Sequence, residues 1–281
     1  MMERTSEFQY RPPWRAVSYH PGSHPGTQRG SGYELHGIAP LHVAGDPRRF
    51  DLRASLRDPF GQLQVRVFKQ RSTVPVYLLA DVSASMSFVS KTCKFDLLIE
   101  FANSLAYSAF RVGDPFAFTA CDTRVRDELS VPLTRARGVG TLVCDRLRRW
   151  APSGADATGL VSGADRIANS RALVFVVSDY HLPIELVRTV MDRLSAHAVV
   201  PVVLVDTGES RCPGFGITHL YDPETGARRT VLLRRSWARR FEKKMLEHHN
   251  QLIHCFADHD LRPLYLIDRF EPEAVSRYFY E

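Results

Sequence analysis

The most regular feature of the chain is an alternation of apolar runs with apolar residues at helical spacing, which starts at residue 74. Four apolar runs read as strands buried on both faces: 74–80, 115–121, 172–177 and 198–205. Helical spacing separates these runs, and a short apolar run at 264–267 predicts one further strand. Strands that alternate with helices predict an α/β fold with a doubly wound, mainly parallel sheet of about six strands.

Residues 1–72 differ in composition from the rest of the chain. The stretch YHPGSHPGTQRGSGYELHG (19–37) is dense in Gly, Pro, Ser and His, which predicts loop. Leu63, Val65 and Val67 then alternate with polar residues, as in a half-buried strand. We therefore predict a loop-rich, partly β N-terminal extension over 1–72 and an α/β domain over 73–281.

Charge and composition narrow the class of protein. The 281 residues carry a net charge of +6, but the positive charge is almost all arginine, and no nucleic-acid-binding motif accompanies it. The longest apolar run, Ala198–Val205, is too short to span a bilayer, and the first residues are polar, unlike a secretory signal. The five cysteines are scattered without a C-x-x-C pair, which favours reduced thiols. We expect a cytoplasmic protein with no membrane span and no nucleic-acid partner.

Two of the predicted strands end in oxygen-bearing side chains. In YLLADVSASMSF (78–89), an apolar run passes directly into Asp81, Ser83 and Ser85. The run 172–177 ends in a serine followed by Asp179. Ligands of doubly wound sheets lie beyond the carboxyl ends of the strands, so neighbouring strands would bring the two carboxylates together.

The stretch PSGADATGL (152–160) predicts a loop that enters a helix and offers Asp156 and Thr158. Carboxylates and hydroxyls form an all-oxygen set that suits a hard cation, since Mg²⁺ takes six oxygens at about 2.0–2.1 Å. The sequence therefore predicts a site for Mg²⁺ or Mn²⁺ with one position left for an oxygen from outside the chain.

This arrangement resembles a known motif. D-x-S-x-S after a buried strand, a threonine loop, and S-D after a later strand resemble the metal-ion-dependent adhesion site (MIDAS) of von Willebrand factor A domains. The resemblance implies direct metal ligands and carboxylates that act largely through water: Ser83, Ser85 and Thr158 as the former, Asp81 and Asp179 as the latter. The loop departs from the usual G-G-T form, so Asp156 is an alternative to Thr158.

A wider resemblance covers most of the chain from about residue 30. GSGYELHG, GDPRRFDLRAS, VRVFKQRS and YDPETG are similar to segments of the domain-of-unknown-function 58 family, bacterial proteins that accompany MoxR-type AAA+ ATPases. The resemblance implies a non-enzymatic adaptor that works with such an ATPase in the maturation of, or metal insertion into, a client complex. An acidic residue of the ATPase or the client would complete the metal shell. Methanol dehydrogenase is one possible client, because some relatives sit in its gene clusters.

The same residues allow other interpretations. Ser85 or Ser87 could simply cap the helix that follows. An aspartyl-phosphate phosphatase would need a second aspartate where Ser83 stands, and a serine hydrolase would need G-x-S-x-G. A metal-assisted hydrolase or phosphatase using Asp81 and Asp179 remains the alternative function, with His181 as the nearby candidate base.

The C-terminal third holds two further features. EHHNQLIHCFADHD (247–260) contains four histidines near a cysteine but no H-E-x-x-H pattern, so surface residues are favoured over a zinc site. Arginines and lysines between 234 and 244 predict a solvated helix face, with a binding strip for the ATPase or an acidic client as the alternative.

Overall fold

The computed structural model describes most of the chain and divides it into two compact units, each built around its own sheet. The larger unit consists of Met1–Tyr10, Pro75–Arg111 and Pro115–Glu281, and the smaller unit of Arg11–Val74 and Val112–Asp114. The residues described are 6–16, 18, 20–30, 32, 34–152, 154, 156–168, 170–209, 216–221, 228–233 and 235–281.

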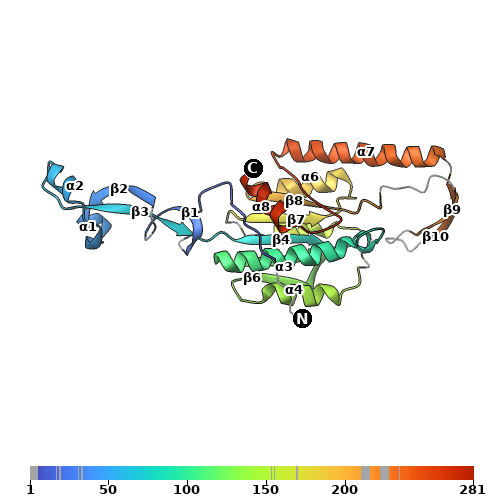
Figure 1. The fold of residues 1–281 in the computed structure, drawn as a ribbon, viewed down its shortest axis with the longest axis horizontal. Coiled ribbons are helices and arrows are strands. Elements are labelled where there is room, and N and C mark those ends of the chain that lie inside the picture. The colour runs from blue at the N-terminus through green and yellow to red at the C-terminus, as the bar shows by residue number, and fades with distance from the viewer. Residues whose placement is uncertain are drawn as a thin grey trace. The chain divides into compact units, whose positions relative to one another are not determined.

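The larger unit is built on a six-stranded sheet in the order β11-β8-β7-β4-β5-β6 (Figure 1). Its strands are β4 (Val76–Asp81), β5 (Phe116–Cys121), β6 (Val125–Thr134), β7 (Leu173–Ser178), β8 (Ala198–Val205) and β11 (Leu264–Ile267). Neighbouring strands are parallel except β5 and β6, which are antiparallel. The predicted fold class, a doubly wound and mainly parallel sheet, is confirmed.

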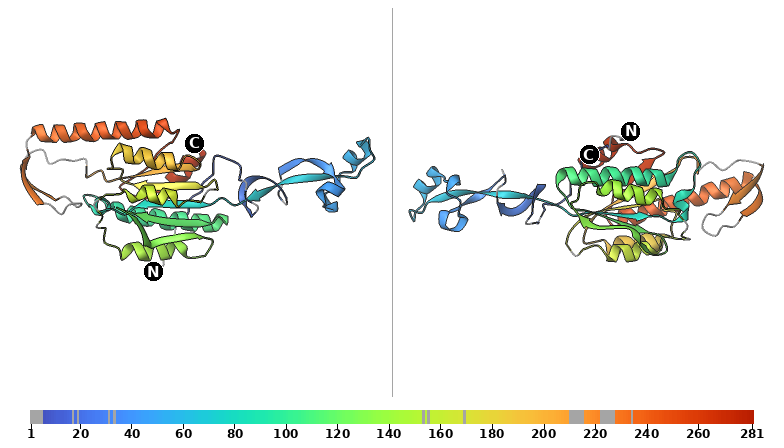
Figure 2. Two further views of the ribbon diagram at one scale, coloured as in Figure 1. Left: turned by 180° about the vertical axis from the view of Figure 1, so that it is seen from behind. Right: turned by 90° about the horizontal axis from the view of Figure 1, so that it is seen from below.

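Helices cover both faces of this sheet (Figures 1 and 2). They are η2 (Ala84–Ser87), α3 (Lys94–Val112), α4 (Val139–Arg148), α5 (Gly159–Asp165), α6 (Ile184–Arg193), α7 (Arg235–Asp258) and α8 (Pro272–Tyr280). On one face, Phe101 of α3 and Phe279 of α8 contact Phe175 of β7, with ring centroids 5.7 and 6.1 Å apart. On the other face, buried apolar residues of α5, α6 and α7 form one cluster with Val174 and Val176. Burial on both faces explains why these strands read as continuous apolar runs.

The smaller unit holds a three-stranded antiparallel sheet in the order β1-β3-β2. Its elements are β1 (Pro21–Gly30), β2 (Glu34–Pro40), α1 (Leu41–Ala44), η1 (Pro47–Arg49), α2 (Leu52–Arg57) and β3 (Gln64–Ser72). The alternation at residues 63–67 correctly predicted β3, but the prediction of loop over 19–37 is wrong. Gly22 and Gly26 let β1 lie close to β3, since a Cβ on either would collide with the β3 backbone or the residue after it.

Other segments differ from the predictions in detail. The edge strand β6 was not predicted, because exposed residues interrupt its apolar positions and it pairs on one side only. The stretch DPETG (222–226) predicts a turn between two short extended pieces. The structure has β9 (Gly216–Tyr221) and β10 (Arg228–Leu233) there, and they pair antiparallel. The predicted turn itself lies outside the described residues.

Candidate functional site

The site is built where β4 and β7 end side by side. These strands pair in parallel with Ala80 opposite Val177, so the next residues, Asp81 and Ser178, are neighbours across the sheet. The Ser178 hydroxyl donates to Asp81 Oδ2 at 2.7 Å and accepts from the backbone N–H of Tyr180 at 2.9 Å. Parallel pairing therefore links the two predicted strand ends through one buried hydrogen bond.

The serines after Asp81 belong to a tight turn. The Ser83 N–H donates to Asp81 Oδ1 at 2.9 Å, and the hydroxyl oxygens of Ser83 and Ser85 lie 3.2 Å apart. Ser83 occupies the N-cap position of η2, but its side chain makes no capping hydrogen bond, whereas Ser87 donates to the Ala84 carbonyl. The Ser87 hydroxyl is thus bonded within its own turn, whereas the Ser83 and Ser85 hydroxyls keep oxygen lone pairs for a ligand.

Asp179, the second carboxylate, forms an ion pair that the sequence analysis missed. Lys94 Nζ lies 2.7 Å from Asp179 Oδ2 and 2.6 Å from Glu209 Oε1. The side chains of Lys94 and Asp179 are each only 1% exposed. The backbone N–H of His181 donates to the other Asp179 oxygen at 3.1 Å. Both oxygens of this carboxylate therefore have a partner within the chain.

Charges and burial set the two aspartates apart. Burial, and after it the charge of Asp179, raises the pKa of Asp81 to about 6. Burial alone would also raise the pKa of Asp179, but His181 and Lys94 outweigh it and hold that pKa below its ordinary value. Burial likewise opposes the charge of Lys94, yet Asp179 and Glu209 together raise the lysine pKa. The surroundings therefore favour the charged forms of Lys94 and Asp179, whereas burial disfavours the charged form of Asp81.

The loop that carries the third predicted ligand lies against the serine turn. The Ala84 N–H donates to the Gly154 carbonyl at 3.0 Å. Thr158 and Asp156 are both exposed and are bound to each other: the Thr158 hydroxyl lies 2.7 Å from Asp156 Oδ1 and 3.3 Å from the Thr123 carbonyl oxygen. The structure thus brings together Asp81, Ser83 and Ser85, whereas the choice between Thr158 and Asp156 stays a prediction.

The backbone beyond β7 has an unusual conformation. Tyr180 is buried with φ of 55°, a left-handed value that bulky residues rarely adopt. Its hydroxyl donates to the Val176 carbonyl at 2.9 Å, and His248 Nε2 of α7 lies 2.8 Å from the Tyr180 carbonyl oxygen. Such outliers cluster at functional sites, where the surrounding structure holds them in place.

Asp81 decides whether the donor set fits a divalent cation. Among the residues that the structure describes, the hydrogen-bond partners of its buried carboxylate are neutral: the amide and hydroxyl of Ser83 and the hydroxyl of Ser178. A divalent cation beside Asp81 would supply the missing positive charge, and the Ser83 and Ser85 hydroxyls would supply oxygen ligands. The residues present at this strand end therefore fit Mg²⁺ or Mn²⁺.

The histidine-rich end of α7 does not gather ligands for zinc. His259 Nδ1 lies 2.7 Å from the Cys255 carbonyl oxygen, and its Nε2 lies 3.0 Å from Asp192 Oδ1. Within the described part of the chain, no group of three or more His, Cys, Asp or Glu side chains could hold a metal ion. The strand-end site is of a different kind, because most of its candidate ligands are serine and threonine hydroxyls.

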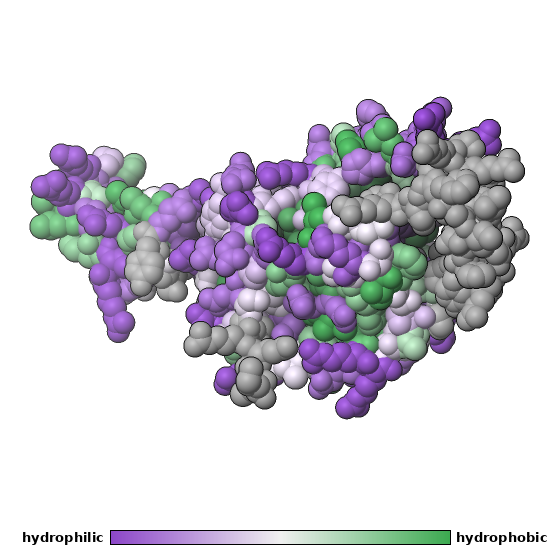
Figure 3. All heavy atoms as spheres, turned by 45° about the vertical axis from the view of Figure 1, so that its right-hand side comes forward, coloured by the Kyte–Doolittle hydropathy of each residue, from purple (hydrophilic) through white to green (hydrophobic). Residues whose placement is uncertain are grey.

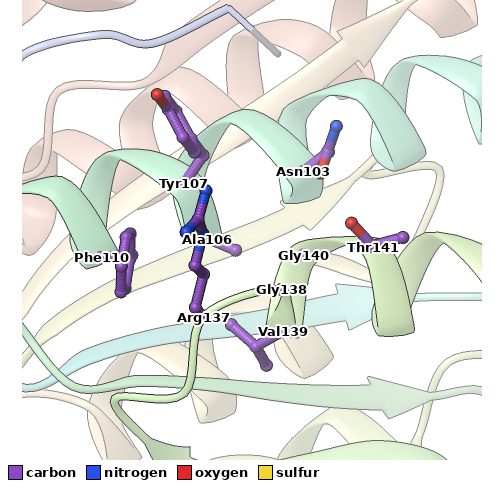
Figure 4. A pocket seen from close by; sticks show the side chains of 9 residues that line it. All are labelled: Asn103, Ala106, Tyr107, Phe110, Arg137, Gly138, Val139, Gly140 and Thr141. Atoms are coloured by element: carbon purple, nitrogen blue, oxygen red, sulfur yellow. The ribbon is translucent and has the colours of Figure 1, made fainter. Parts of the chain in front are cut away.

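A separate cavity of about 140 Å³ lies between α3 and the start of α4 (Figure 4). Its lining residues are Asn103, Ala106, Tyr107, Phe110, Arg137, Gly138, Val139, Gly140 and Thr141. Asn103, the lining residue of α3 that is nearest in sequence to Lys94, follows it by nine positions, which is about 14 Å along a helix axis. The cavity therefore shares no residue with the strand-end site and lies well away from it.

Some site residues could have been found from sequence with closer attention to spacing. Lys94 is four positions before Leu98 and so lies on the buried side of α3, where an unpaired lysine would be costly. That spacing predicts a buried carboxylate partner for Lys94. The sequence pattern places Ser178 at a strand end but gives it no role. Glu209 carries no comparable signal, because it follows β8 by four residues in an irregular segment.

Comparison with known proteins gives one family and several relatives. A family model described as "Protein of unknown function DUF58" matches residues 42–251. An uncharacterized protein in the moxR 3' region of Paracoccus denitrificans is 33% identical over 102 residues, covering 36% of this chain and 97% of the relative. An uncharacterized protein of Mycobacterium tuberculosis is 26% identical over 216 residues, covering 73% of this chain but only 62% of the relative.

Solved structures with a similar fold include two domains of low sequence identity. The conserved hypothetical protein BatB from Bacteroides thetaiotaomicron has a TM-score of 0.44 at 11% identity, covering 74% of this chain and 97% of that chain. The SpRpn10 VWA domain has a TM-score of 0.43 at 10% identity, covering 73% and 95%. Both TM-scores are below 0.5, so neither likeness carries a conclusion about this chain.

The prediction of a cytoplasmic location is corrected. A third similar structure belongs to an aerotolerance-related membrane protein from Bacteroides fragilis, with a TM-score of 0.43 at 12% identity over 74% of this chain and 96% of that chain. Scattered cysteines do not assign a compartment, so the cytoplasmic prediction does not stand. In the part of the chain that the structure describes, no helix has the length and apolarity needed to cross a bilayer.

Proposed function

Starting from a chain that belongs to the DUF58 family of proteins of unknown function, we propose that it is a non-enzymatic protein-interaction module that depends on a divalent cation. The observation that carries the proposal is Asp81: a buried carboxylate with neutral hydrogen-bond partners, beside two serine hydroxyls that make no helix cap. A bound cation would offset the free-energy cost of burying this negative charge, which apolar packing does not do.

The residues of the chain would hold the cation in defined roles. Ser83 and Ser85 would bind it through their hydroxyls, Asp81 would act on it largely through water, and Thr158 or Asp156 would complete the chain's share. Asp179 would add negative charge from the neighbouring strand. When bound, Mg²⁺ or Mn²⁺ would supply a positive charge with an open position that an acidic side chain of another protein can fill. Binding of this kind needs neither a nucleophile nor a general base.

The partner that we propose is a MoxR-type AAA+ ATPase or a client protein of that ATPase. Support comes from the relative in the moxR 3' region of Paracoccus denitrificans, which this chain matches over nearly all of that relative's length. In this role the chain acts as an adaptor, with the ATPase supplying the energy. The chain spans 62% of the mycobacterial relative, so nothing about that whole protein carries over by itself.

A hydrolase using the same site is the second candidate. His181 Nδ1 lies 3.8 Å from Asp179 Oδ2, and the histidine side chain is 39% exposed, so a general base stands beside the carboxylates. Against it, the Asp179 oxygens are occupied by Lys94 and by the His181 backbone amide. Asp179 is therefore less free to activate water than an unpaired carboxylate would be.

Pull-down of a purified MoxR-type ATPase tests the proposal. The full chain should retain the ATPase in Mg²⁺ and lose most of it in EDTA, because the metal forms part of the contact. The double substitution Ser83→Ala and Ser85→Ala should cause the same loss in Mg²⁺ with an unchanged circular dichroism spectrum. Ser87→Ala is the matched control and should bind like the wild type, since Ser87 donates to a carbonyl within its own turn.

Two results would decide against the proposal. Equal recovery with and without EDTA, in the wild type and in the double variant, would show that the metal site takes no part in binding. Hydrolysis of a phosphate or carboxylic ester that disappears in the double variant and in His181→Ala would favour the hydrolase.

A further inference from the structure

Lys94 stands out because it is a charged side chain with no exposure to water at the first position of α3. A buried ammonium is stable only with charge partners close by. Lys94 has two, Asp179 at 2.7 Å and Glu209 at 2.6 Å. The lysine therefore joins β7, the segment after β8 and the start of α3 at the candidate metal site.

This contact divides the two site aspartates into unlike groups. Asp179 faces a full positive charge at hydrogen-bond distance, whereas Asp81 is bonded only to neutral amide and hydroxyl groups of Ser83 and Ser178. Asp179 also acts electrostatically on Asp81, so the two carboxylates sense each other. A cation that binds beside Asp81 therefore meets a site in which Lys94 already balances one of the two negative charges.

We propose that Lys94 is an internal counter-ion that competes with the divalent cation for Asp179, with Glu209 sharing the ammonium, so that this pair sets the metal affinity of the site. The proposal rests on the proposed function, since it takes the cation to bind beside Asp81, Ser83 and Ser85. Lys94 opposes binding of the cation in two ways. Its positive charge repels the cation, and its ion pair with Asp179 keeps that carboxylate from the cation. Glu209 works in the other direction, because it draws the ammonium and offsets its charge.

The two residues therefore predict effects of opposite sign. Lys94→Met keeps an unbranched stem in the buried space and removes the charge, so Mn²⁺ should bind at least about tenfold more tightly, as expected for a nearby charge in partly buried surroundings. Glu209→Gln keeps the shape and leaves the ammonium to Asp179 alone, so Mn²⁺ should bind several-fold more weakly. In the Lys94→Met background, Glu209→Gln should have a much smaller effect, because the lysine through which it acts is gone.

Titration of the full-length protein with Mn²⁺, followed by electron paramagnetic resonance and calorimetry, measures these affinities directly. Lys91→Met is the matched control. Lys91 lies three residues before Lys94, and its ammonium is bonded 2.5 Å away to Asp268, a different strand-end carboxylate. Its removal should leave Mn²⁺ affinity within about twofold of the wild type, because its side chain is largely exposed and screened by water.

The outcomes separate this inference from the proposed function. A folded Lys94→Met variant with wild-type or weaker affinity would overturn the role of Lys94 while leaving the metal site standing. If Lys94→Met does not fold, Glu209→Gln decides: unchanged affinity overturns the inference. If neither the wild type nor any variant binds Mn²⁺, the metal site itself is wrong and both proposals fall. Binding seen only after Lys94→Met supports the inference in its strongest form.

Discussion

At the scale of single residues, Asp81 is a buried carboxylate whose charge lowers the stability of the folded protein. The pKa of Asp81 is raised from 3.8 to about 6 by burial and by Asp179. An acid with a raised pKa in the folded state costs stability wherever it is charged. The cost is absent below about pH 4, grows as the pH rises from 4 to 6, and is fully present above pH 6.

The substitution Asp81→Asn tests this cost. Asparagine keeps one oxygen for the Ser83 amide and removes the charge, so in EDTA near neutral pH the variant should be more stable than the wild type by about 1–3 kcal/mol. The difference should vanish near pH 4. Thermal unfolding in chelator at a series of pH values measures it. A variant that is less stable at every pH would show that Asp81 is satisfied without a cation.

The place of Asp81 at a strand end could be predicted from local sequence order, because the apolar run of β4 stops there. The folded chain shows that β4 pairs with β7. Lys94 was missed because its partners are 85 and 115 positions away along the chain. Only the folded chain shows which carboxylates an apolar helix face brings to a lysine.

At the scale of elements, buried strands and their helices could be read from the apolar pattern, whereas β1 and β2 could not. In β1 the pattern fails because glycine replaces side chains whose alternation would reveal a strand, and close approach to β3 takes the place of side-chain packing. In β2 it fails because no residue is buried, so no apolar face marks the strand. The edge strand β6 was missed for a related reason, since half-exposed strands have no continuous apolar run.

Glycine in the smaller unit offers a matched pair of variants. A Cβ at Gly26 would collide with the Gln70 carbonyl of β3, whereas a Cβ at Gly37 meets nothing within 4 Å. Gly26→Ala should therefore destabilise the β1–β3 pairing by about 1–3 kcal/mol, and Gly37→Ala should not. Hydrogen exchange of the β1 and β3 amides checks this. Similar exchange rates in the two variants would contradict the role given to Gly26.

At the scale of the whole molecule, each unit offers a different kind of surface for partners. The larger unit carries the strand-end site, where charge is concentrated. The smaller unit exposes apolar side chains around α1 and α2 (Figure 3), with Leu56 at 78% and Phe60 at 82% exposure. Exposed apolar groups of this size fit a module that works by binding other proteins. The fold class could be predicted because each strand and helix has its own run of apolar residues. Partner surfaces could not, because they combine residues that are far apart in the sequence.

The most direct test of the central claim is anomalous diffraction from crystals of the full chain grown with Mn²⁺. We expect one strong anomalous peak within coordination distance of the Ser83 and Ser85 hydroxyl oxygens. Asp81 should contact this Mn²⁺ ion directly or through water. The same data would show whether Thr158 or Asp156 is the third ligand. Crystals saturated with Mn²⁺ that show no peak beside these serines, or a peak only elsewhere in the chain, would contradict it.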